Sequence, residues 1–533
     1  MQLRTKKSAR AITLRRQPVL LCLIVILVAG CRRDPDGFHT PPYLQRPATD
    51  GITVIWFSRK ARPGELIVRT RCDNRVARKL TSTPSPVPDP VYPTGASPSI
   101  AGDAESTVPF RHLVTVRSLD AGRRYRYEVR QGDERFAGQF RTAPVRDTPV
   151  RFIIYADSET QPASTGSSVP WPDPAAPDSQ RTYLIDQTRG YANNLCLIRE
   201  WEPDFIVIAG DLVEIGGEQS HWDEFWRHNV NVNANLSLAG NVPIFAVLGN
   251  HEYYAGPSAG NRFHSSATQK FLGYFPPPED GETDESGRYY HVTYGPVSLV
   301  VLDVCNGLPH QSERDTNHLF SGSPDDPQNY APDFNPESRQ YLWLEAKLRD
   351  TQLKSRFTFV AFHHAPYSSG PHGLPPGVGP GFDPQTGKPV RMLTPLFLKY
   401  GVDAVFSGHD EMYERSEISG IEIQPSGDGQ EHTIHFYDVG IGGDGLRATM
   451  AAAINPHRRF VAHHDAPEVW ENGRLREGGK HYGHLTVDVR QTADGHWRAT
   501  LTPVYVLPVY SEADRDYTGY ERKVYDDVVI IDR

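Results

Sequence analysis

The feature of this sequence that most constrains its fold is a series of six short apolar runs, rich in β-branched residues, between residues 150 and 408. The runs read VRFIIYA (150–156), DFIVIAG (204–210), VPIFAVLG (242–249), VSLVVLD (297–303), RFTFVAF (356–362) and VDAVFSG (402–408). Such near-continuous apolar character is typical of strands that are buried on both faces. Helix-like stretches such as 338–351 lie between several of the runs. The pattern predicts an α/β layered domain, which we place at 149–510, with a closing hairpin at 484–506 and a tail at 511–533.

Polar side chains follow five of these runs, at the point where each predicted strand ends. They are Asp157, Glu159, Asp211, Glu214, Asn250, His251, Glu252, His363, His364, His409, Asp410 and Glu411. In open α/β sheets, ligands bind beyond the carboxyl ends of the strands. A single acid at such a position is usually a helix cap or a turn residue. Five unrelated caps would not all select metal-binding side chains, so we expect these strand ends to form a metal site.

The segment 39–146 has a different pattern, with short β-rich runs separated by turn residues. The runs are ITVIWFS (52–58), ELIVRT (65–70), RHLVTV (111–116), RRYRYEVR (123–130) and RFAGQFRTA (135–143). They predict a small all-β sandwich, while the Pro-rich stretch 83–99 cannot join a central strand. The phrase HLVTVRSLDAGRRYRYEVR resembles the fibronectin type III pattern, in which a tyrosine corner leads into a late strand. A tyrosine corner is a packing device, so we expect no chemistry from this domain.

The first 31 residues have the pattern of an export signal. A basic stretch is followed by about 12 apolar residues, from Val19 to Gly30, which is short for a membrane span and suits a signal peptide. The segment ends Val28-Ala29-Gly30-Cys31, which resembles the bacterial lipobox, where the cysteine is acylated. We therefore predict a lipid anchor at Cys31; the alternative is an uncleaved membrane anchor. Since Arg32 is not an Asp-type retention signal, we favour the periplasmic face of the outer membrane.

Charge and cysteine content narrow the function classes further. The chain has a formal net charge of −9, and its first 30 residues are basic, so the remainder is more acidic still. A general nucleic-acid surface is therefore not expected. Beyond the signal segment the cysteines are Cys72, Cys196 and Cys305, which are widely spaced and contain no CxxC metal motif. The sequence allows one disulfide between two of these three cysteines.

The ordered motifs at the strand ends resemble one known family. The series D-x-E, GD-x-x-E, GNHE, HH-x-P and GH-x-E resembles the calcineurin-like metallophosphoesterases, and the fibronectin-like domain makes it similar to their purple acid phosphatase branch. This resemblance implies a multidomain fold, with an all-β fibronectin type III-like sandwich followed by an α/β four-layer metallophosphoesterase domain. It also implies a phosphate-ester substrate and hydrolysis at two metal ions, where a metal-bound hydroxide attacks phosphorus.

Roles for individual residues come from the same resemblance. Asp211 corresponds to the carboxylate that bridges both metals, and Asn250, His364 and His409 correspond to ligands of the second metal. His364 is chosen over His363 because it precedes x-Pro, which leaves His363 an outer role. His251 would steady the transition state or protonate the leaving oxygen, a task that suits an imidazole. His372 would contact the phosphate.

Two departures from the purple acid phosphatase pattern affect the first metal. Glu214 stands where the pattern has Tyr, and Glu411 stands where it has His. With Asp157 and Asp211, the first site becomes oxygen-only, and Glu159 is a further candidate ligand. An all-carboxylate shell favours a hard cation (Fe, Mn, Mg or Ca), whereas the histidine-bound site favours Zn, Fe or Mn.

The sequence thus favours a lipid-anchored phosphomonoesterase acting outside the cytoplasm. The alternative is a catalytically weakened or inert phosphoesterase fold that serves as a binding or adhesion lipoprotein, because both substitutions fall in one metal shell. GIGGDG (440–445) matches the dinucleotide-binding pattern G-x-G-x-x-G literally. It lacks a surrounding βαβ unit, so we interpret it as a Gly-rich loop that borders the metal cleft.

Overall fold

The structure of the chain is a computed structural model. It describes residues 36–87, 109–160, 170–173, 176–182, 186–254, 256, 265–278, 287–305, 332, 334, 336–374, 386–472, 474–511 and 516–533. The predicted signal segment, including Cys31, lies outside the described residues. Within the described parts of the chain, no helix combines the length and the apolar character needed to cross a membrane.

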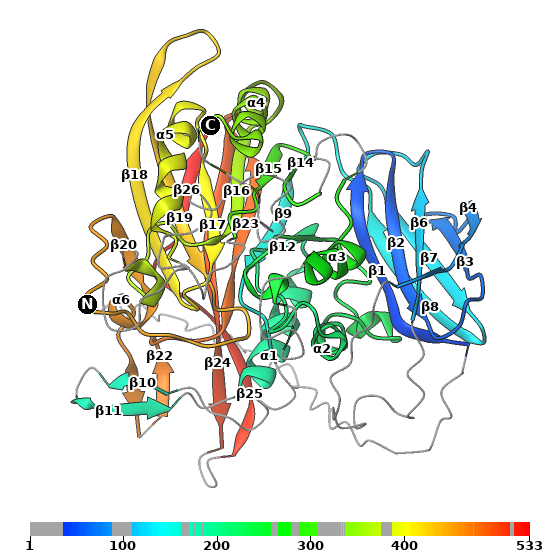
Figure 1. The fold of residues 1–533 in the computed structure, drawn as a ribbon, viewed down its shortest axis with the longest axis horizontal. Helices are drawn as coiled ribbons and strands as arrows, with labels where there is room; N and C mark the ends of the chain where they lie inside the picture. The colour runs from blue at the N-terminus through cyan, green and yellow to red at the C-terminus, as the bar shows by residue number, and fades with distance from the viewer. Residues whose placement is uncertain are drawn as a thin grey trace, which may run out of the picture.

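The N-terminal part folds as two antiparallel four-stranded sheets, ordered β1-β2-β6-β5 and β4-β3-β7-β8 (Figure 1). The strands are β1 (Phe38–Ala48), β2 (Gly51–Ser58), β3 (Glu65–Thr70), β4 (Val76–Thr81), β5 (Ser85–Pro86), β6 (Phe110–Val116), β7 (Arg124–Gln131) and β8 (Glu134–Arg141). Trp56, Val68 and Phe136 belong to one buried apolar cluster built from strands of both sheets. The hydroxyl of Tyr125 accepts a hydrogen bond from the backbone N–H of Asp120 at 3.0 Å, which ties the start of β7 to the preceding turn.

The larger part contains two seven-stranded sheets. The first is ordered β13-β12-β9-β23-β24-β25, with β26 also paired to β24. Its strands are β9 (Val150–Tyr155), β12 (Phe205–Ile208), β13 (Ile244–Ala246), β23 (Gly483–Gln491), β24 (Trp497–Tyr510), β25 (Tyr517–Val524) and β26 (Val529–Asp532). β12 runs parallel to β9 and β13, and β23 and β24 form the predicted closing hairpin.

The second sheet is ordered β14-β15-β16-β17-β19-β18-β20. Its strands are β14 (Tyr290–Tyr294), β15 (Val297–Val301), β16 (Phe357–His364), β17 (Ala404–Gly408), β18 (Tyr413–Ile423), β19 (Gly429–Val439) and β20 (Arg458–Val461). β15, β16, β17 and β19 are parallel neighbours. Smaller elements are the hairpins β10 (Pro170–Asp173) with β11 (Ala176–Thr182) and β21 (Val469–Glu471) with β22 (Arg474–Glu477), and helix α6 (Ala462–Asp465).

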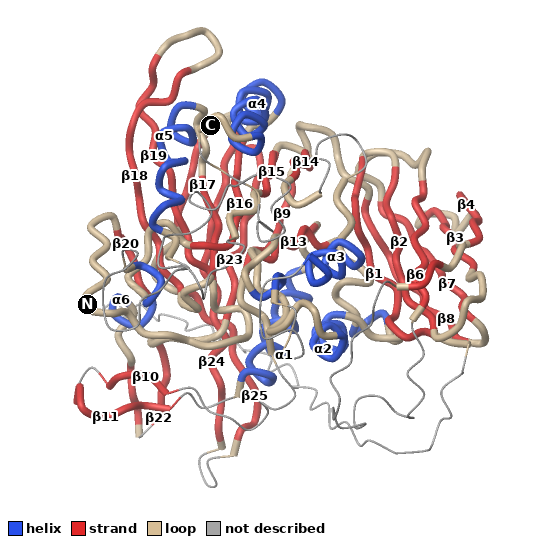
Figure 2. The backbone as a smooth tube through the Cα atoms, in the orientation of Figure 1, coloured by secondary structure: helices blue, strands red, loops and turns tan. Residues whose placement is uncertain are grey.

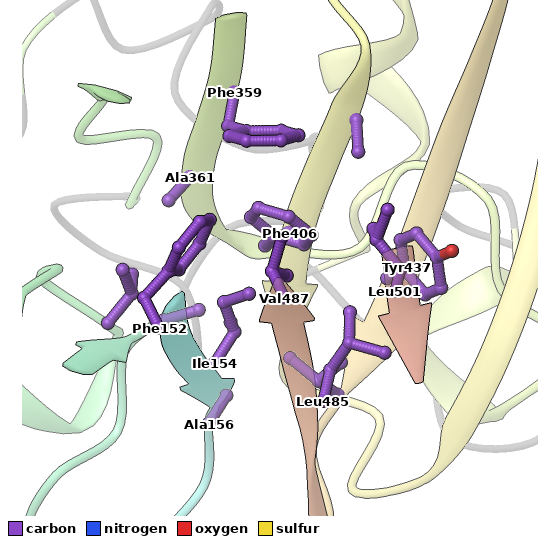
Figure 3. Close-up of a cluster of buried hydrophobic side chains, with 14 of the residues drawn as sticks. Phe152, Ile154, Ala156, Phe359, Ala361, Phe406, Tyr437, Leu485, Val487 and Leu501 are labelled. Carbon is purple, nitrogen blue, oxygen red and sulfur yellow. The ribbon is translucent and has the colours of Figure 1, made fainter. Parts of the chain in front are cut away.

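The two sheets face each other across a shared core, and helices cover their outer faces (Figure 2). Phe152 and Ile154 of β9 meet Phe359 of β16 and Val487 of β23 in this core (Figure 3). The side chains that alternate with these point away from the shared core. Ile153 of β9 packs in a cluster with the helices that cover the first sheet, and alternate positions of β16 pack in a cluster with the helices that cover the second sheet. Because both faces of these strands are buried, their apolar runs are continuous. The predicted α/β layered fold is therefore confirmed.

Helices α1, α2 and α3 pack on the first sheet, and α4 and α5 pack on the second. Their bounds are α1 (Gln187–Trp201), α2 (Gln219–Asn229), α3 (Ser265–Tyr274), α4 (Arg339–Lys354) and α5 (Thr394–Lys399). The N-terminal sandwich docks on α2 and α3. Tyr43 of β1 stacks on Trp226 of α2 with ring centroids 4.1 Å apart, and its hydroxyl donates to the carbonyl of Tyr274 at 3.0 Å.

Residues 511–533, which we expected to be a tail, supply β25 and β26 of the first sheet. Arg533 fastens this segment to the second sheet. Its guanidinium donates to the buried carboxylate of Asp403 at 2.8 Å and to Glu422 at 2.8 Å. The segment is thus an integral part of the layered domain.

Candidate metal centre

The carboxyl ends of the five predicted strands converge on one buried site. At the ends of β9 and β12, the N–H of Asp157 donates to the carbonyl of Gly210 at 3.2 Å, and Ser158 N–H donates to the carbonyl of Asp211 at 2.9 Å. The end of β17 joins them, because the N–H of His409 donates to Asp157 Oδ2 at 3.0 Å. The predicted grouping of strand ends is present in the fold.

The backbone at this site is strained. Four of the predicted ligands have positive φ, namely Asp157 (55°), Asp211 (50°), His409 (78°) and Glu411 (48°). Left-handed conformations at non-glycine residues are costly and concentrate at functional sites. The turns after β9, β12 and β17 therefore aim these side chains into a common space at the expense of local stability.

Asp211 lies at the centre of the site. Its Oδ2 is 2.8 Å from His363 Nε2, and its Oδ1 accepts the backbone N–H of His251 at 3.0 Å. Burial on its own would raise the pKa of Asp211, but His363 and His251 outweigh it and hold the pKa below its usual range. Asp211, His363 and His409 offer ligand atoms that all lie within 4.8 Å of one another. This group can hold a metal through oxygen and nitrogen.

Both histidines of the HH motif reach the site, in different ways. His363 Nδ1 donates to the carbonyl of Ala209 at 2.9 Å, which turns Nε2 toward Asp211. His364, the ligand we predicted, lies against His409 with ring centroids 4.4 Å apart. His363, to which we gave an outer role, is thus the one in direct contact with Asp211.

Burial, then the neighbouring imidazoles, lowers the pKa of His409, which favours the neutral form that binds metals.

Asn250 and Glu159 each present a buried oxygen that finds no hydrogen-bond partner among the described residues, Asn250 Oδ1 and Glu159 Oε2. Buried polar atoms are normally paired, and an orphan is a sign of an absent ligand. Burial first, and then Asp211 and Asp444, raise the pKa of Glu159 well above its usual range. A cation would relieve this repulsion.

Two more groups of potential ligands share Glu159. Glu159, Asp211 and His251 form one, and Glu159, Glu411 and Asp444 form the other, each with ligand atoms within 4.8 Å of one another. Asp444 was not predicted; it belongs to the Gly-rich loop 440–445. Glu214 is in none of these groups. Its carbonyl accepts from His251 Nδ1 at 2.8 Å, and its carboxylate is 4.0 Å from the same nitrogen.

His251 contacts the group through Asp211, and His372 contacts it through His409. Burial opposes protonation of His251, but Asp211 and Glu214 outweigh it and raise the pKa to about 9. The ring of His372 lies 3.7 Å from that of His409, measured between centroids. Arg447 was also missed by sequence reasoning. It donates to His372 Nε2 at 2.5 Å and pairs with Glu411 Oε1 at 2.5 Å.

Glu252, the last residue of GNHE, holds two loops of the site together. Its Oε1 accepts the N–H groups of Leu212 and Val213, and its Oε2 accepts those of Asp211 and Gly249. The side chain is fully buried. Its role is to position Asp211 and Asn250, since neither oxygen is directed at the ligand groups.

Comparison with known proteins agrees with this fold. Residues 184–412 match the calcineurin-like phosphoesterase family. Probable purple acid phosphatase 20 of Arabidopsis thaliana is 25% identical over 41% of this chain and 41% of its own length, well short of the whole relative. Fe(3+)-Zn(2+) purple acid phosphatase 12 of the same plant is 22% identical over 81% of this chain and 79% of its own.

A solved structure extends the likeness to nearly the whole chain. Purple acid phosphatase PPD1 from yellow lupin (Lupinus luteus) seeds superposes with a TM-score of 0.53 at 17% identity, over 90% of this chain and 73% of that one. The chain thus has the fold of this phosphatase, with a β domain at its N-terminus. The chain carries a calcineurin-like phosphoesterase domain and is similar to the purple acid phosphatases, so the predicted resemblance is confirmed.

Proposed function

We propose that this protein is a metal-dependent phosphoesterase that hydrolyses phosphate monoesters outside the cytoplasm. The observation that carries the proposal is the Asp211 group, in which an ionised, buried carboxylate is shared between an imidazole-rich side and a carboxylate-rich side. A bridging carboxylate between two unlike cations needs this arrangement. The family match and the purple acid phosphatase relatives support the same reaction class.

The side chains fit two metal ions of different hardness. Asp211, Asn250 and His409, with His363 or His364, would hold a Zn, Fe or Mn ion, and Asp157, Asp211 and Glu411 would hold a harder cation. When bound, two such ions polarise the phosphoryl oxygens and make hydroxide available near neutral pH. The relative named for iron and zinc supports a dinuclear centre of this kind. Because Glu214 replaces the tyrosine, we expect no purple colour.

Side chains around the metals supply proton transfer and phosphate binding. His251 holds a proton at neutral pH because Asp211 and Glu214 favour its charged form. This proton can pass to the oxygen of the leaving alcohol. The Arg447 guanidinium contacts His372 and carries a permanent charge that suits a phosphate dianion. The fixed cation is our reason for favouring monoesters, which carry one more negative charge than diesters.

Turnover of a chromogenic phosphate monoester tests the proposal. Chelator-stripped protein should be inactive and should regain activity with Mn²⁺, Mg²⁺, Ca²⁺, Fe or Zn²⁺, alone or in pairs. The monoester should be cleaved faster than the matching bis-ester, and the visible spectrum should lack a strong charge-transfer band. A well-folded sample that shows no turnover with any metal or pair would reject the enzyme and favour the inert binding protein.

We also propose that the mature protein is anchored by a lipid on Cys31, on the basis of the Val28-Ala29-Gly30-Cys31 sequence. Acyl chains attached to a protein bind it to a membrane without a spanning helix. Expressed in a bacterium fed an alkyne fatty acid, the protein should become labelled and sediment with membranes. The Cys31→Ala variant should lose the label; a label that persists in this variant would contradict the proposal, and Cys22→Ala serves as the control.

A further inference from the structure

The Gly-rich loop 440–445 is fastened to the end of β9. Gly442 N–H donates to the carbonyl of Ala156 at 2.9 Å, and the N–H groups of Gly443 and Asp444 both donate to the carbonyl of Asp157 at 2.9 Å. Three consecutive backbone bonds fix this loop to the strand that carries the first predicted ligand. The Asp444 side chain is therefore held in place, and it faces the site from outside the five strand ends.

Asp444, Glu159 and Glu411 place carboxylate oxygens within 4.8 Å of one another. Glu159 contributes the independent sign of a ligand, because its Oε2 is buried, belongs to a side chain that is 2% exposed, and finds no hydrogen-bond partner among the described residues. Three acids gathered in this way are stable only with protons or with a cation between them.

The side-chain contacts of Glu411 and Asp444 each engage one oxygen of the carboxylate. Arg447 contacts Oε1 of Glu411, and the amide of Gln187 contacts Oδ1 of Asp444. Gly445 makes room for Glu411: a Cβ built on Gly445 would lie 1.5 Å from Glu411 Oε2, and φ at this residue is +57°. The loop thus combines a ligand, Asp444, with a glycine that lets a second ligand approach.

We propose that Glu159 and Asp444 join Glu411, Asp157 and Asp211 as ligands of the hard cation of the centre, with Asp444 supplied by the Gly-rich loop. The group contains no nitrogen or sulfur donor, so it selects Ca²⁺, Mn²⁺ or Mg²⁺ over Zn²⁺. The proposal rests on the proposed function only in assuming that the centre is a metal site. It adds a ligand from a loop outside the strand ends, and it explains how a shell without Tyr and His at the family positions still holds an ion.

Direct metal binding tests the assignment without reference to catalysis. Full-length chelator-stripped protein would be titrated with Ca²⁺ and with Mn²⁺ by calorimetry, and bound metal counted after dialysis. We expect Asp444→Asn and Glu159→Gln each to weaken Ca²⁺ and Mn²⁺ binding by about tenfold or more, since ligand charge sets affinity at such sites. Zn²⁺ bound at the histidine side should remain at its wild-type stoichiometry in both variants.

Asp438→Asn is the matched control. Asp438 is also a buried acid; its Oδ1 accepts the N–H of Gly440 at 3.1 Å, and an asparagine keeps that acceptor. It lies outside the three ligand groups, so its variant should bind Ca²⁺ and Mn²⁺ as the wild type does. Wild-type affinity in folded Asp444→Asn and Glu159→Gln would overturn the proposal, with folding checked by thermal melting.

The two proposals fail in different ways. If Ca²⁺ and Mn²⁺ bind to the wild type and are lost in Asp444→Asn while no phosphate ester is cleaved, the cation site stands and the enzyme function falls. If the esters are cleaved and Asp444→Asn binds metal normally, the function stands and the Asp444 assignment falls.

Discussion

Asp211→Asn is expected to lower phosphoesterase turnover roughly 10³-fold, or about 4 kcal/mol in the activation free energy. The variant keeps the size of the side chain and one acceptor for the N–H of His251, but it loses the negative charge beside His363. A neutral amide cannot bridge two cations, so both metal sites should weaken together. The measurements are kcat on a phosphate monoester and the metal content after dialysis.

Asp204→Asn is the control for this variant, because Asp204 lies at the other end of the same strand, β12. Its carboxylate accepts from Arg141 at 2.8 Å and from the N–H of Arg151 at 3.1 Å, far from the ligand groups. Turnover in this control should stay within about twofold of the wild type, although the lost ion pair costs some stability. Equal turnover in Asp211→Asn and Asp204→Asn would refute the assigned role of Asp211.

The layered fold could be read from the sequence because its strands carry a strong local signal. Both faces of β9 and β16 are buried, and residues such as Ile153 and Ile154 on opposite faces are therefore both apolar. The structure of the segment after residue 510 was harder to predict. β25 mixes half-buried and exposed positions at the sheet edge, so its sequence YTGYERKV gives no continuous apolar run, and pairing with β24 decides its structure.

The candidate site was predictable where ligands follow strands directly. Four of the predicted ligands come directly after strands β9, β12, β13 and β17 or their short extensions: Asp157, Asp211, Asn250 and His409. Ligands that follow neighbouring strands of a sheet therefore lie close together in the site. Asp444 could not be placed in this way. Its position depends on hydrogen bonds between loop 440–445 and the distant carbonyl of Asp157, which no local pattern encodes.

The choice between His363 and His364 shows another limit. Because successive side chains of a strand point to opposite faces, the two rings on β16 are predicted to point to different sides. This alternation does not predict which ring faces Asp211. The hydrogen bond from His363 to the carbonyl of Ala209 decides it, and that carbonyl belongs to the turn after β12 in the other sheet. Arg447 was missed for a related reason, because its partners Glu411 and His372 come from two separate loops.

Glu252→Gln should have the second-largest effect, even though Glu252 touches no ligand group. Each carboxylate oxygen accepts two backbone N–H groups, Oε1 at 2.8 Å (Leu212) and 3.3 Å (Val213), and Oε2 at 3.0 Å (Asp211) and 2.8 Å (Gly249). A glutamine must turn its NH₂ toward one of these donor pairs in either orientation. Two buried N–H groups then lose their acceptor, so the free energy of unfolding should fall by about 2–4 kcal/mol.

Loosening this clamp also releases the backbone of Asp211 from the turn that precedes Asn250, so metal affinity and turnover should fall with stability. Denaturation of the metal-free protein measures the loss of stability without the contribution of bound ions.

Glu224→Gln on α2 is the matched control. Glu224 is equally buried, but its Oε1 accepts from both Arg227 and His228, while its Oε2 has no hydrogen-bond partner among the described residues. A glutamine there can keep its oxygen toward both donors, so the loss should be about 1 kcal/mol with turnover unchanged. If Glu252→Gln is no less stable than Glu224→Gln and binds metal normally, the four-bond clamp does not organise the site, and the strained turns that carry Asp211 and Asn250 must be held by the strands alone.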